Sequence, residues 1–188
     1  MEQLKEQLIK SFKFTEEDWE ITSQYIGELS LQAKELFLEK GKISDRIGIV
    51  KSGLLRTYFY NEDGDEITTQ FFTKGTLVIS SSSFNLQVSS KEYIVTVEPS
   101  ELLIFTYSDM QELLEKVPAW QKVPIAAAEY KNRQKEKRII EFQTMPAKQR
   151  YLQFLEKYPE ICRSATVGQI ASYLGIDIAT LSRIRKNI

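Results

Sequence analysis

The sequence lacks histidine altogether and has a single cysteine, Cys162. Histidine is the commonest metal ligand and the usual general base near neutral pH, so its absence argues against most hydrolytic triads and histidine-ligated metal enzymes. One thiol cannot form an intramolecular disulfide, and by itself it cannot hold an iron–sulfur cluster or a thiolate zinc site. We therefore expect no catalytic residue, no metal site and no cofactor, and we interpret Cys162 as a packing residue.

Long apolar runs are missing as well. No segment approaches the roughly 20 apolar residues that a membrane-spanning helix needs. The first six residues alternate charged and apolar side chains, unlike the apolar centre of a signal peptide. The 188 residues are 42% hydrophobic and 27% charged, which is typical of one large or two small globular domains. These features predict a cytoplasmic protein without membrane contact.

The net charge of −1 conceals an uneven distribution along the chain. From Glu129 to the end there are twelve Lys or Arg and six Asp or Glu, so this part carries +6 and the part before it carries −7. A basic terminal region on an acidic body is typical of nucleic-acid binding, although a charge run is often only a solvated face.

Two kinds of periodicity divide the first two thirds of the chain. Apolar residues at helical spacing predict two short helices before about Gly27, the second capped by Thr15. Between about Lys34 and Tyr107, β-branched and aromatic residues with closely spaced glycines predict a jelly roll or small barrel of short antiparallel strands. Strands are expected around 47–51, 54–60, 66–72, 93–97 and 101–105, with Asp63-Gly64 in the turn of the clearest hairpin.

Helical spacing returns after residue 107. Ser108 is the expected cap of one helix, and a long helix is predicted from Pro124 to Thr144. Within the long helix, residues 131–138 form a polar run that could lie on a solvated face and that leaves a poor heptad seam. A further helix over 147–157 is expected to turn Tyr151, Leu152 and Leu155 inward and to close at Tyr158-Pro159.

The last 23 residues, from Thr166 to Ile188, have the pattern of a helix-turn-helix. Thr166 and Gln169 form a predicted capping box, Gly175 suits the left-handed conformation that ends a helix, and Asp177 caps a second helix to about Asn187. Two helices joined by so short a turn must share one small core. The residues predicted to build it are Ile170, Ala171, Leu174, Ile176, Leu181 and Ile184, with Ile188 on the same side of the second helix.

The outer face of the second helix is predicted to enter the major groove of DNA. Arg183 is the best candidate for a bidentate contact to guanine, and Lys186 or Arg185 is expected to neutralise phosphate. The other residues predicted to contact DNA are Ile178, Ala179, Thr180 and Ser182 on this helix and Arg163 just before the motif. The alternative interpretation is a pair of amphipathic helices that close a helical subdomain, but the agreement of caps, glycine and basic face favours DNA binding.

The whole chain resembles the Crp/Fnr family of bacterial regulators. The residues that carry the resemblance are 49–56 (IVKSGLLR), the Asp63-Gly64 hairpin, 71–75 (FFTKG), 170–175 (IASYLG) and 181–186 (LSRIRK). Together with 150–152 (RYL) and 158–160 (YPE), the last segment is similar to the branch common in Bacteroidetes-type bacteria. The resemblance implies a jelly roll like that of cyclic-nucleotide-binding domains, a dimerising connector helix and DNA binding as a homodimer.

The sequence departs from the cyclic-AMP-binding members of that family. Those members hold the ribose and the cyclic phosphate with a Gly-Glu-Leu segment and a later Arg-Ser or Arg-Thr pair, and neither is present. The corresponding positions are Ser80, Ser81, Ser82 and Ser83, followed by Glu92 and Tyr93. A carboxylate at Glu92 would repel a phosphodiester, so we predict no cyclic-AMP binding. The serines are either a pocket for another effector or a polar loop without a ligand.

The fold expected from these arguments is α+β: an antiparallel jelly roll with flanking helices, a long connector helix and a small helix-turn-helix domain. The predicted boundaries are 1–122, 123–145 and 146–188. The expected partners are double-stranded DNA, a second copy of the chain and an unidentified small-molecule effector, with RNA polymerase as a further candidate. Two alternatives remain, a cupin-like enzyme, which usually needs histidine ligands, and a protein-binding adaptor on the same scaffold.

Overall fold

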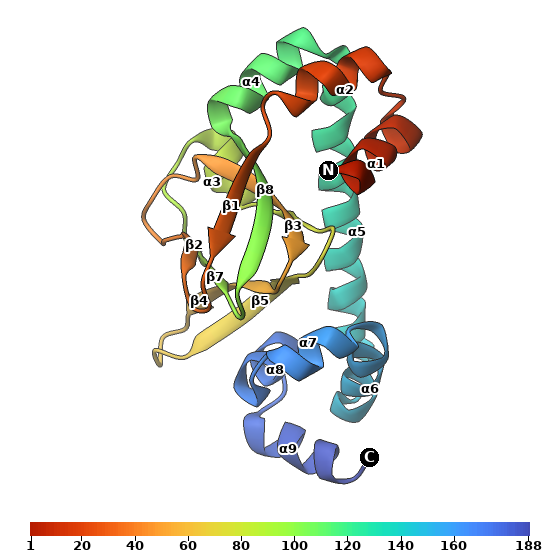
Figure 1. The fold of residues 1–188 in the computed structure, drawn as a ribbon. Coiled ribbons are helices and arrows are strands. Elements are labelled where there is room, and N and C mark those ends of the chain that lie inside the picture. The colour runs from red at the N-terminus through yellow and green to blue at the C-terminus, as the bar shows by residue number, and fades with distance from the viewer.

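Eight strands form two four-stranded antiparallel sheets in the computed structural model, which describes residues 1–188 (Figure 1). One sheet has the strand order β1-β8-β3-β6 and the other β2-β7-β4-β5. The strands are β1 (Gly27–Leu31), β2 (Leu36–Leu38), β3 (Arg46–Ser52), β4 (Leu55–Tyr60), β5 (Glu66–Phe72), β6 (Leu77–Val78), β7 (Tyr93–Thr96) and β8 (Ser100–Thr106). The predicted jelly roll is thereby confirmed.

The side chains that alternate inward along these strands fill the space between the sheets. Leu55, Phe72, Ile94 and Leu102 come from four different strands, and none of them is exposed to solvent. The β4–β5 hairpin turns where expected, with Gly64 at a positive φ of 84°, a conformation that glycine adopts without steric cost. Burial of this apolar surface, rather than any single contact, stabilises the sheet pair.

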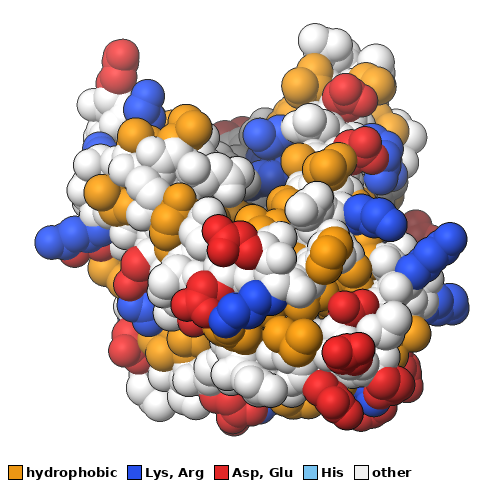
Figure 2. All heavy atoms as spheres, turned by 90° about the horizontal axis from the view of Figure 1, so that it is seen from above, with side chains coloured by type: hydrophobic (Ala, Val, Ile, Leu, Met, Phe, Trp, Pro, Cys, Tyr) orange, Lys and Arg blue, Asp and Glu red, His pale blue; other side chains and the backbone are white.

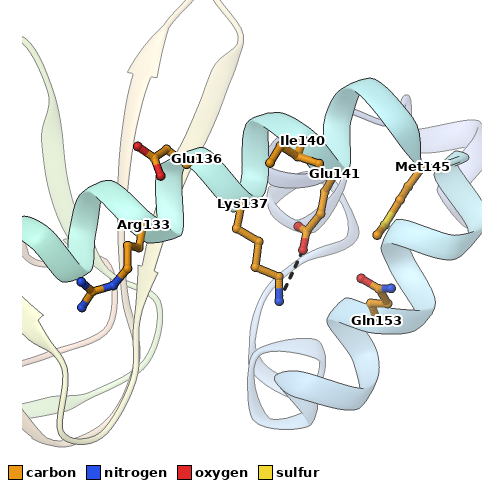
Figure 3. Close-up of a pocket in the computed structure, with 7 residues that line it drawn as sticks. All are labelled: Arg133, Glu136, Lys137, Ile140, Glu141, Met145 and Gln153. Carbon is orange, nitrogen blue, oxygen red and sulfur yellow. Dashed lines mark ion pairs between the residues drawn. The ribbon is translucent and has the colours of Figure 1, made fainter.

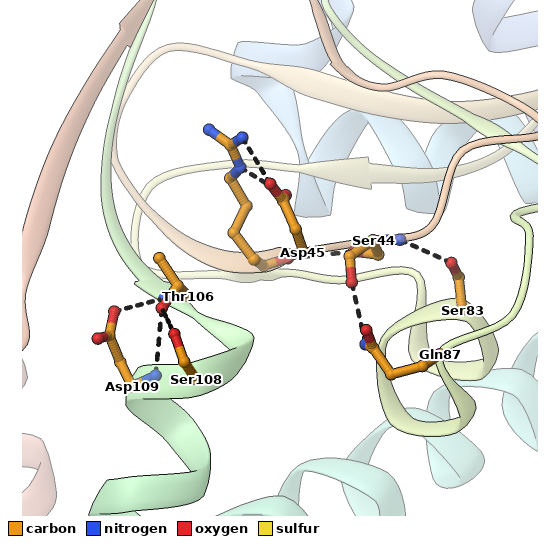
Figure 4. Close-up of polar contacts among 8 residues, drawn as sticks. Ser44, Asp45, Ser83, Gln87, Thr106, Ser108 and Asp109 are labelled. Atoms are coloured by element: carbon orange, nitrogen blue, oxygen red, sulfur yellow. Dashed lines mark hydrogen bonds and ion pairs between the residues drawn. The ribbon is translucent and has the colours of Figure 1, made fainter.

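Helices cover one end of the jelly roll: α1 (Glu2–Phe12), α2 (Glu16–Ser23), α4 (Tyr107–Lys116) and the short 3₁₀ helix η1 (Pro118–Gln121). Thr15 caps α2 as predicted, in a capping box with Asp18. The cap expected at Ser108 is wrong by two residues. Thr106 caps α4 instead, and its hydroxyl accepts from the backbone N–H of Asp109 at 3.1 Å (Figure 4). Ser108 lies inside the helix and contacts only the Thr106 hydroxyl.

The long helix α5 (Lys122–Thr144) runs beside the jelly roll and continues to the C-terminal helices (Figure 1). It begins at Lys122, two residues before the predicted start at Pro124. The helix can include Pro124 because a residue in the first turn of a helix needs no backbone N–H donor. None of its 23 residues is fully buried. Neither α5 nor any other helix is long and apolar enough to cross a membrane.

Four short helices follow: α6 (Ala147–Lys157), α7 (Pro159–Ser164), α8 (Val167–Leu174) and α9 (Ile178–Lys186). The helix predicted over 147–157 is confirmed and closes at Tyr158 as expected, and Pro159 then begins α7. The inward position expected for Leu152 is wrong, because Leu152 is 39% exposed and Phe154 takes its place in the core. Ile188 also lies outside the core, because α9 ends before it. A proline at the first position of a helix is favoured, so Pro159 could equally have predicted this start.

The C-terminal helices dock against the jelly roll through α8 and β5. Phe71 of β5 packs against the rings of Phe154 and Tyr173, and the Thr68 N–H donates to the Ser172 hydroxyl at 3.1 Å. Arg138 of α5 completes the contact. Its guanidinium donates to the Thr69 and Tyr173 carbonyls at 2.5 Å each and lies 4.1 Å from the centre of the Tyr173 ring. The connector helix, the sheet edge and α8 therefore share one set of contacts.

Candidate nucleic-acid interface

The first helix of the motif, α8, has the predicted local structure. The Thr166 hydroxyl accepts from the Gln169 N–H at 3.2 Å, and the Gln169 side chain accepts from the Thr166 N–H at 3.0 Å. Gly175 ends the helix at a φ of 59°, and a Cβ placed there would lie 2.6 Å from the ring of Phe142. Glycine is required at this position for both reasons.

The second helix, α9, starts at Asp177, whose carboxylate accepts from the Thr180 N–H at 2.9 Å. Hydrogen bonding by Thr180, through its side chain first and its N–H second, lowers the pKa of Asp177, with a smaller contribution from Arg183, and keeps the cap charged. Leu181 is fully buried against α6 and α8, and Ile184 packs beside it. The inner face of α9 thus anchors the helix, while its opposite face is turned to solvent.

That outer face carries most of the residues predicted to contact DNA. Arg183, Arg185 and Lys186 are exposed, and none of them takes part in the ion pairs of the chain. Ile178 and Ala179 are exposed in the first turn, and Thr180 and Ser182 are half-buried. Arg163 lies apart from this face, exposed on α7. Arg183 and Lys186 therefore make the outer face of α9 basic, whereas Arg185 lies on the side of Leu181, where its charge acts on Tyr151 and Cys162.

This basic surface lies at one end of the molecule. In Figure 1, α9 occupies the end opposite α1, α2 and α4. Figure 2 looks onto that opposite end, where acidic and basic side chains are interspersed with apolar ones. The basic residues of α9 therefore lie at the far end of the molecule from this surface of mixed charge.

The residues of the predicted effector pocket make hydrogen bonds with their own neighbours. Ser80, which is buried, donates to the Glu92 carboxylate at 2.7 Å. Ser83 accepts from the Ser44 N–H at 2.8 Å, as Figure 4 shows, and donates to the Val88 carbonyl at 2.6 Å. Both hydroxyls stabilise α3 (Ser81–Leu86) and the segment after it. The remaining residues of the set differ in surroundings: Ser82 is exposed, and Tyr93 stacks on Tyr58 with ring centres 4.9 Å apart.

The fourth serine, Ser81, is reached by a residue that the sequence did not indicate. Lys131 of α5 donates to the Ser81 hydroxyl at 3.0 Å. Burial lowers the pKa of Lys131, and the charge of Glu92 opposes that shift. Lys131 and Arg138 are seven residues apart and so lie on the same side of α5. The sequence alone does not set them apart from the surrounding charged residues, since Glu129 and Glu136 have the same spacing.

A hollow of about 540 Å³ lies along the junction of α5 and α6. Lys137 and Glu141 of α5 face each other in it, with Nζ and Oε1 3.7 Å apart, and Gln153 of α6 lies opposite (Figure 3). Its walls are mainly charged and polar, unlike the apolar lining of most small-molecule pockets. No three Cys, Asp or Glu side chains of the chain are grouped so as to hold a metal ion.

Comparison with known proteins agrees with this architecture. Residues 28–117 match the family described as cyclic nucleotide-binding domain. The anaerobic regulatory protein of Pasteurella multocida is 25% identical over 167 residues, which cover 82% of this chain and 60% of that protein. The chain thus spans about three fifths of the length of that relative.

Two solved structures show the same fold. FixK2 from Bradyrhizobium japonicum superposes with a TM-score of 0.74 at 17% identity, covering 86% of this chain and 83% of that one. A Crp/Fnr-family structure from Eubacterium rectale gives 0.72 at 16% identity, covering 93% and 83%. Residues 28–117 are thus similar to a cyclic nucleotide-binding domain, and the chain shares its fold with these two proteins over most of its length.

Proposed function

We propose that this protein is a transcriptional regulator that binds double-stranded DNA in a sequence-specific manner through α9. The observation that carries the proposal is the exposed set Arg183, Arg185 and Lys186 on a helix whose inner face is fixed by Leu181. Arg183 is the residue for base recognition, and the other two cations, with Arg163, are suited to phosphate. Such a role places the protein in the cytoplasm, with the chromosome.

We further propose that it acts as a homodimer through α5. Ile125, Asn132 and Ile139 recur every seven residues and are all exposed along one side of α5. The two isoleucines are 62% and 55% exposed, which is unusual for large apolar side chains on the longest helix. A second α5 would cover them, and a pair of asparagines at the central position would favour two helices in a fixed register.

The contact between Ser80 and Glu92 supports a jelly roll that does not respond to cyclic AMP. Ser80 and Glu92 already bind each other, and a carboxylate there would oppose a phosphodiester. An effector of another kind remains compatible with the exposed Ser82. Isothermal titration with cyclic AMP tests the proposal, which predicts no heat of binding and an unchanged affinity for DNA.

DNA binding is tested by selecting bound sequences from a random duplex pool and measuring their affinity by fluorescence anisotropy between 50 and 200 mM salt. We expect an affinity that falls steeply with salt, and Arg183→Ala should lose about 1–3 kcal/mol of discrimination at one base pair. Arg46→Ala, at a half-buried arginine that pairs with Asp45 far from α9, is the control. An unselective pool, or an affinity indifferent to salt, would refute the proposal.

The dimer is tested by sedimentation of the wild type and Ile139→Glu. The variant should be monomeric at micromolar concentration and bind DNA more weakly, because one half-site contact is lost. Leu36→Glu on β2, at an exposed apolar residue on the far side of the jelly roll, should leave the dimer intact.

Arg183→Ala also distinguishes DNA binding from the alternative role as a protein-binding adaptor. An adaptor would keep its affinity for its protein partner in this variant, whereas a regulator would lose specific binding to DNA.

A further inference from the structure

The first turn of α9 is apolar where it is most accessible. Ile178 is the first residue of the helix and is 59% exposed, and the exposed Ala179 follows it. The Ile178 side chain leans toward α8, since a Cβ built on Gly168 would lie 3.6 Å from its Cδ1. Ile178 thus bridges the first turns of both motif helices. In a helix-turn-helix, the first turn of the second helix is the part that contacts base edges.

Arg183 adds a positive charge beside this apolar surface. Its Nε donates weakly to the Ala179 carbonyl at 3.4 Å, so the side chain lies back along α9 toward the first turn. It also lies close enough to Asp177 to contribute to the lowered pKa of that carboxyl. Asp177 itself is held by the Thr180 N–H as the cap. The surface offered to the groove is therefore an isoleucine and an alanine beside a guanidinium.

We propose, on the basis of the DNA-binding function above, that Ile178 and Ala179 select thymine by contact with its C5-methyl group, next to the guanine that Arg183 binds. In the major groove thymine is the one base with an apolar group, and it is the complement of an apolar side chain. Polar residues in the first turn of a recognition helix form hydrogen bonds with the edges of bases. Neither Ile178 nor Ala179 has a side-chain donor or acceptor for such a bond. Adenine and cytosine would lose hydration at this contact without gaining a hydrogen bond.

The experiment replaces each thymine of the selected half-site in turn with deoxyuridine, which removes only the methyl group. Anisotropy titrations should show affinity about fourfold lower for each methyl contacted, from the transfer free energy of one buried methyl group. Placing 5-methylcytosine where cytosine replaces that thymine should recover part of the loss. Ile178→Ala should bind thymine and deoxyuridine sites with nearly equal affinity, which makes the two changes non-additive.

Leu86→Ala is the matched control, because Leu86 is an apolar residue on α3 that is at least as accessible as Ile178 and should leave the ratio unchanged. Circular dichroism melting verifies that Ile178→Ala remains folded. The inference is overturned if the wild type binds every deoxyuridine site as tightly as the thymine site, or if the selected half-site has no thymine beside the guanine. Either result leaves the DNA-binding proposal intact. Absence of any selected sequence refutes the DNA-binding proposal itself.

Discussion

Replacing Arg138 with methionine should weaken the attachment of the C-terminal helices to the jelly roll. The guanidinium makes two hydrogen bonds to carbonyls on either side of the contact, with Thr69 and with Tyr173, and it lies over the Tyr173 ring. Burial lowers the pKa of Arg138, which indicates that solvent competes little for these bonds. Methionine keeps most of the stem and removes every donor.

The expected loss follows from these contacts. A hydrogen bond from a charged donor contributes about 1.5–3 kcal/mol and a ring contact about 0.5–1 kcal/mol. Because Arg138 is only half-buried, we expect about 2–3 kcal/mol for Arg138→Met, out of a total stability of roughly 5–15 kcal/mol. At about 2–4 °C for each kcal/mol, the midpoint of thermal unfolding should fall by about 5–10 °C.

Differential scanning calorimetry measures that midpoint, and hydrogen exchange of the Thr68 amide reports on docking, since this N–H is bonded to Ser172 across the contact. Arg133→Met is the control: Arg133 lies on α5, is exposed and forms one loose ion pair of 3.8 Å with Glu129. If Arg138→Met melts within 1 °C of Arg133→Met and the Thr68 amide stays protected, the guanidinium does not hold the contact.

Three further predictions concern single positions. Gly175→Ala should destabilise the protein by more than about 1–2 kcal/mol in urea unfolding, because its φ is positive and the Phe142 ring would contact the new Cβ. Gly168→Ala, the control, should be neutral or stabilising by up to about 1 kcal/mol. Equal effects of the two substitutions would contradict this reasoning. Asp177→Ala should lower the melting midpoint at pH 7, and the difference from the wild type should shrink below about pH 4, because a carboxyl with a lowered pKa stabilises the fold only while ionised. Burial also lowers the pKa of Lys131, so stability again rises with pH, here because the neutral amine is favoured. The wild type should gain stability relative to Lys131→Met as the pH rises from 8 to 10, and a constant difference would show that the amine is not buried.

The strand pattern and the caps were predictable because they depend on residues close together in the chain. Thr15, Thr166 and Asp177 each bind an N–H three residues away, so the residue types and their spacing suffice to identify them. The cap predicted at Ser108 was wrong because the spacing to Asp109 favours Thr106. The sequence offered that clue, since Asp109 is three residues after Thr106.

The predicted site residues also differ in how far the sequence determines their surroundings. The solvent-exposed face of α9 follows from helical periodicity and from the apolar residues that anchor its other face, so its surface was predictable. The surroundings of the four serines were not. Whether Ser80 meets a ligand or Glu92, and whether Ser81 meets solvent or Lys131, depends on segments up to 50 residues apart.

By itself the sequence determined the β4–β5 hairpin, the long helix, the caps at Thr15, Thr166 and Asp177 and the basic outer face of α9, because these depend on local spacing and on side-chain chemistry. Only the tertiary structure decided what the charged run of α5 does. Read locally, residues 131–138 look like one solvated face. Once α5 lies against the jelly roll, Lys131 reaches α3 and Arg138 joins β5 to α8, because packing between distant segments chooses which charges are buried.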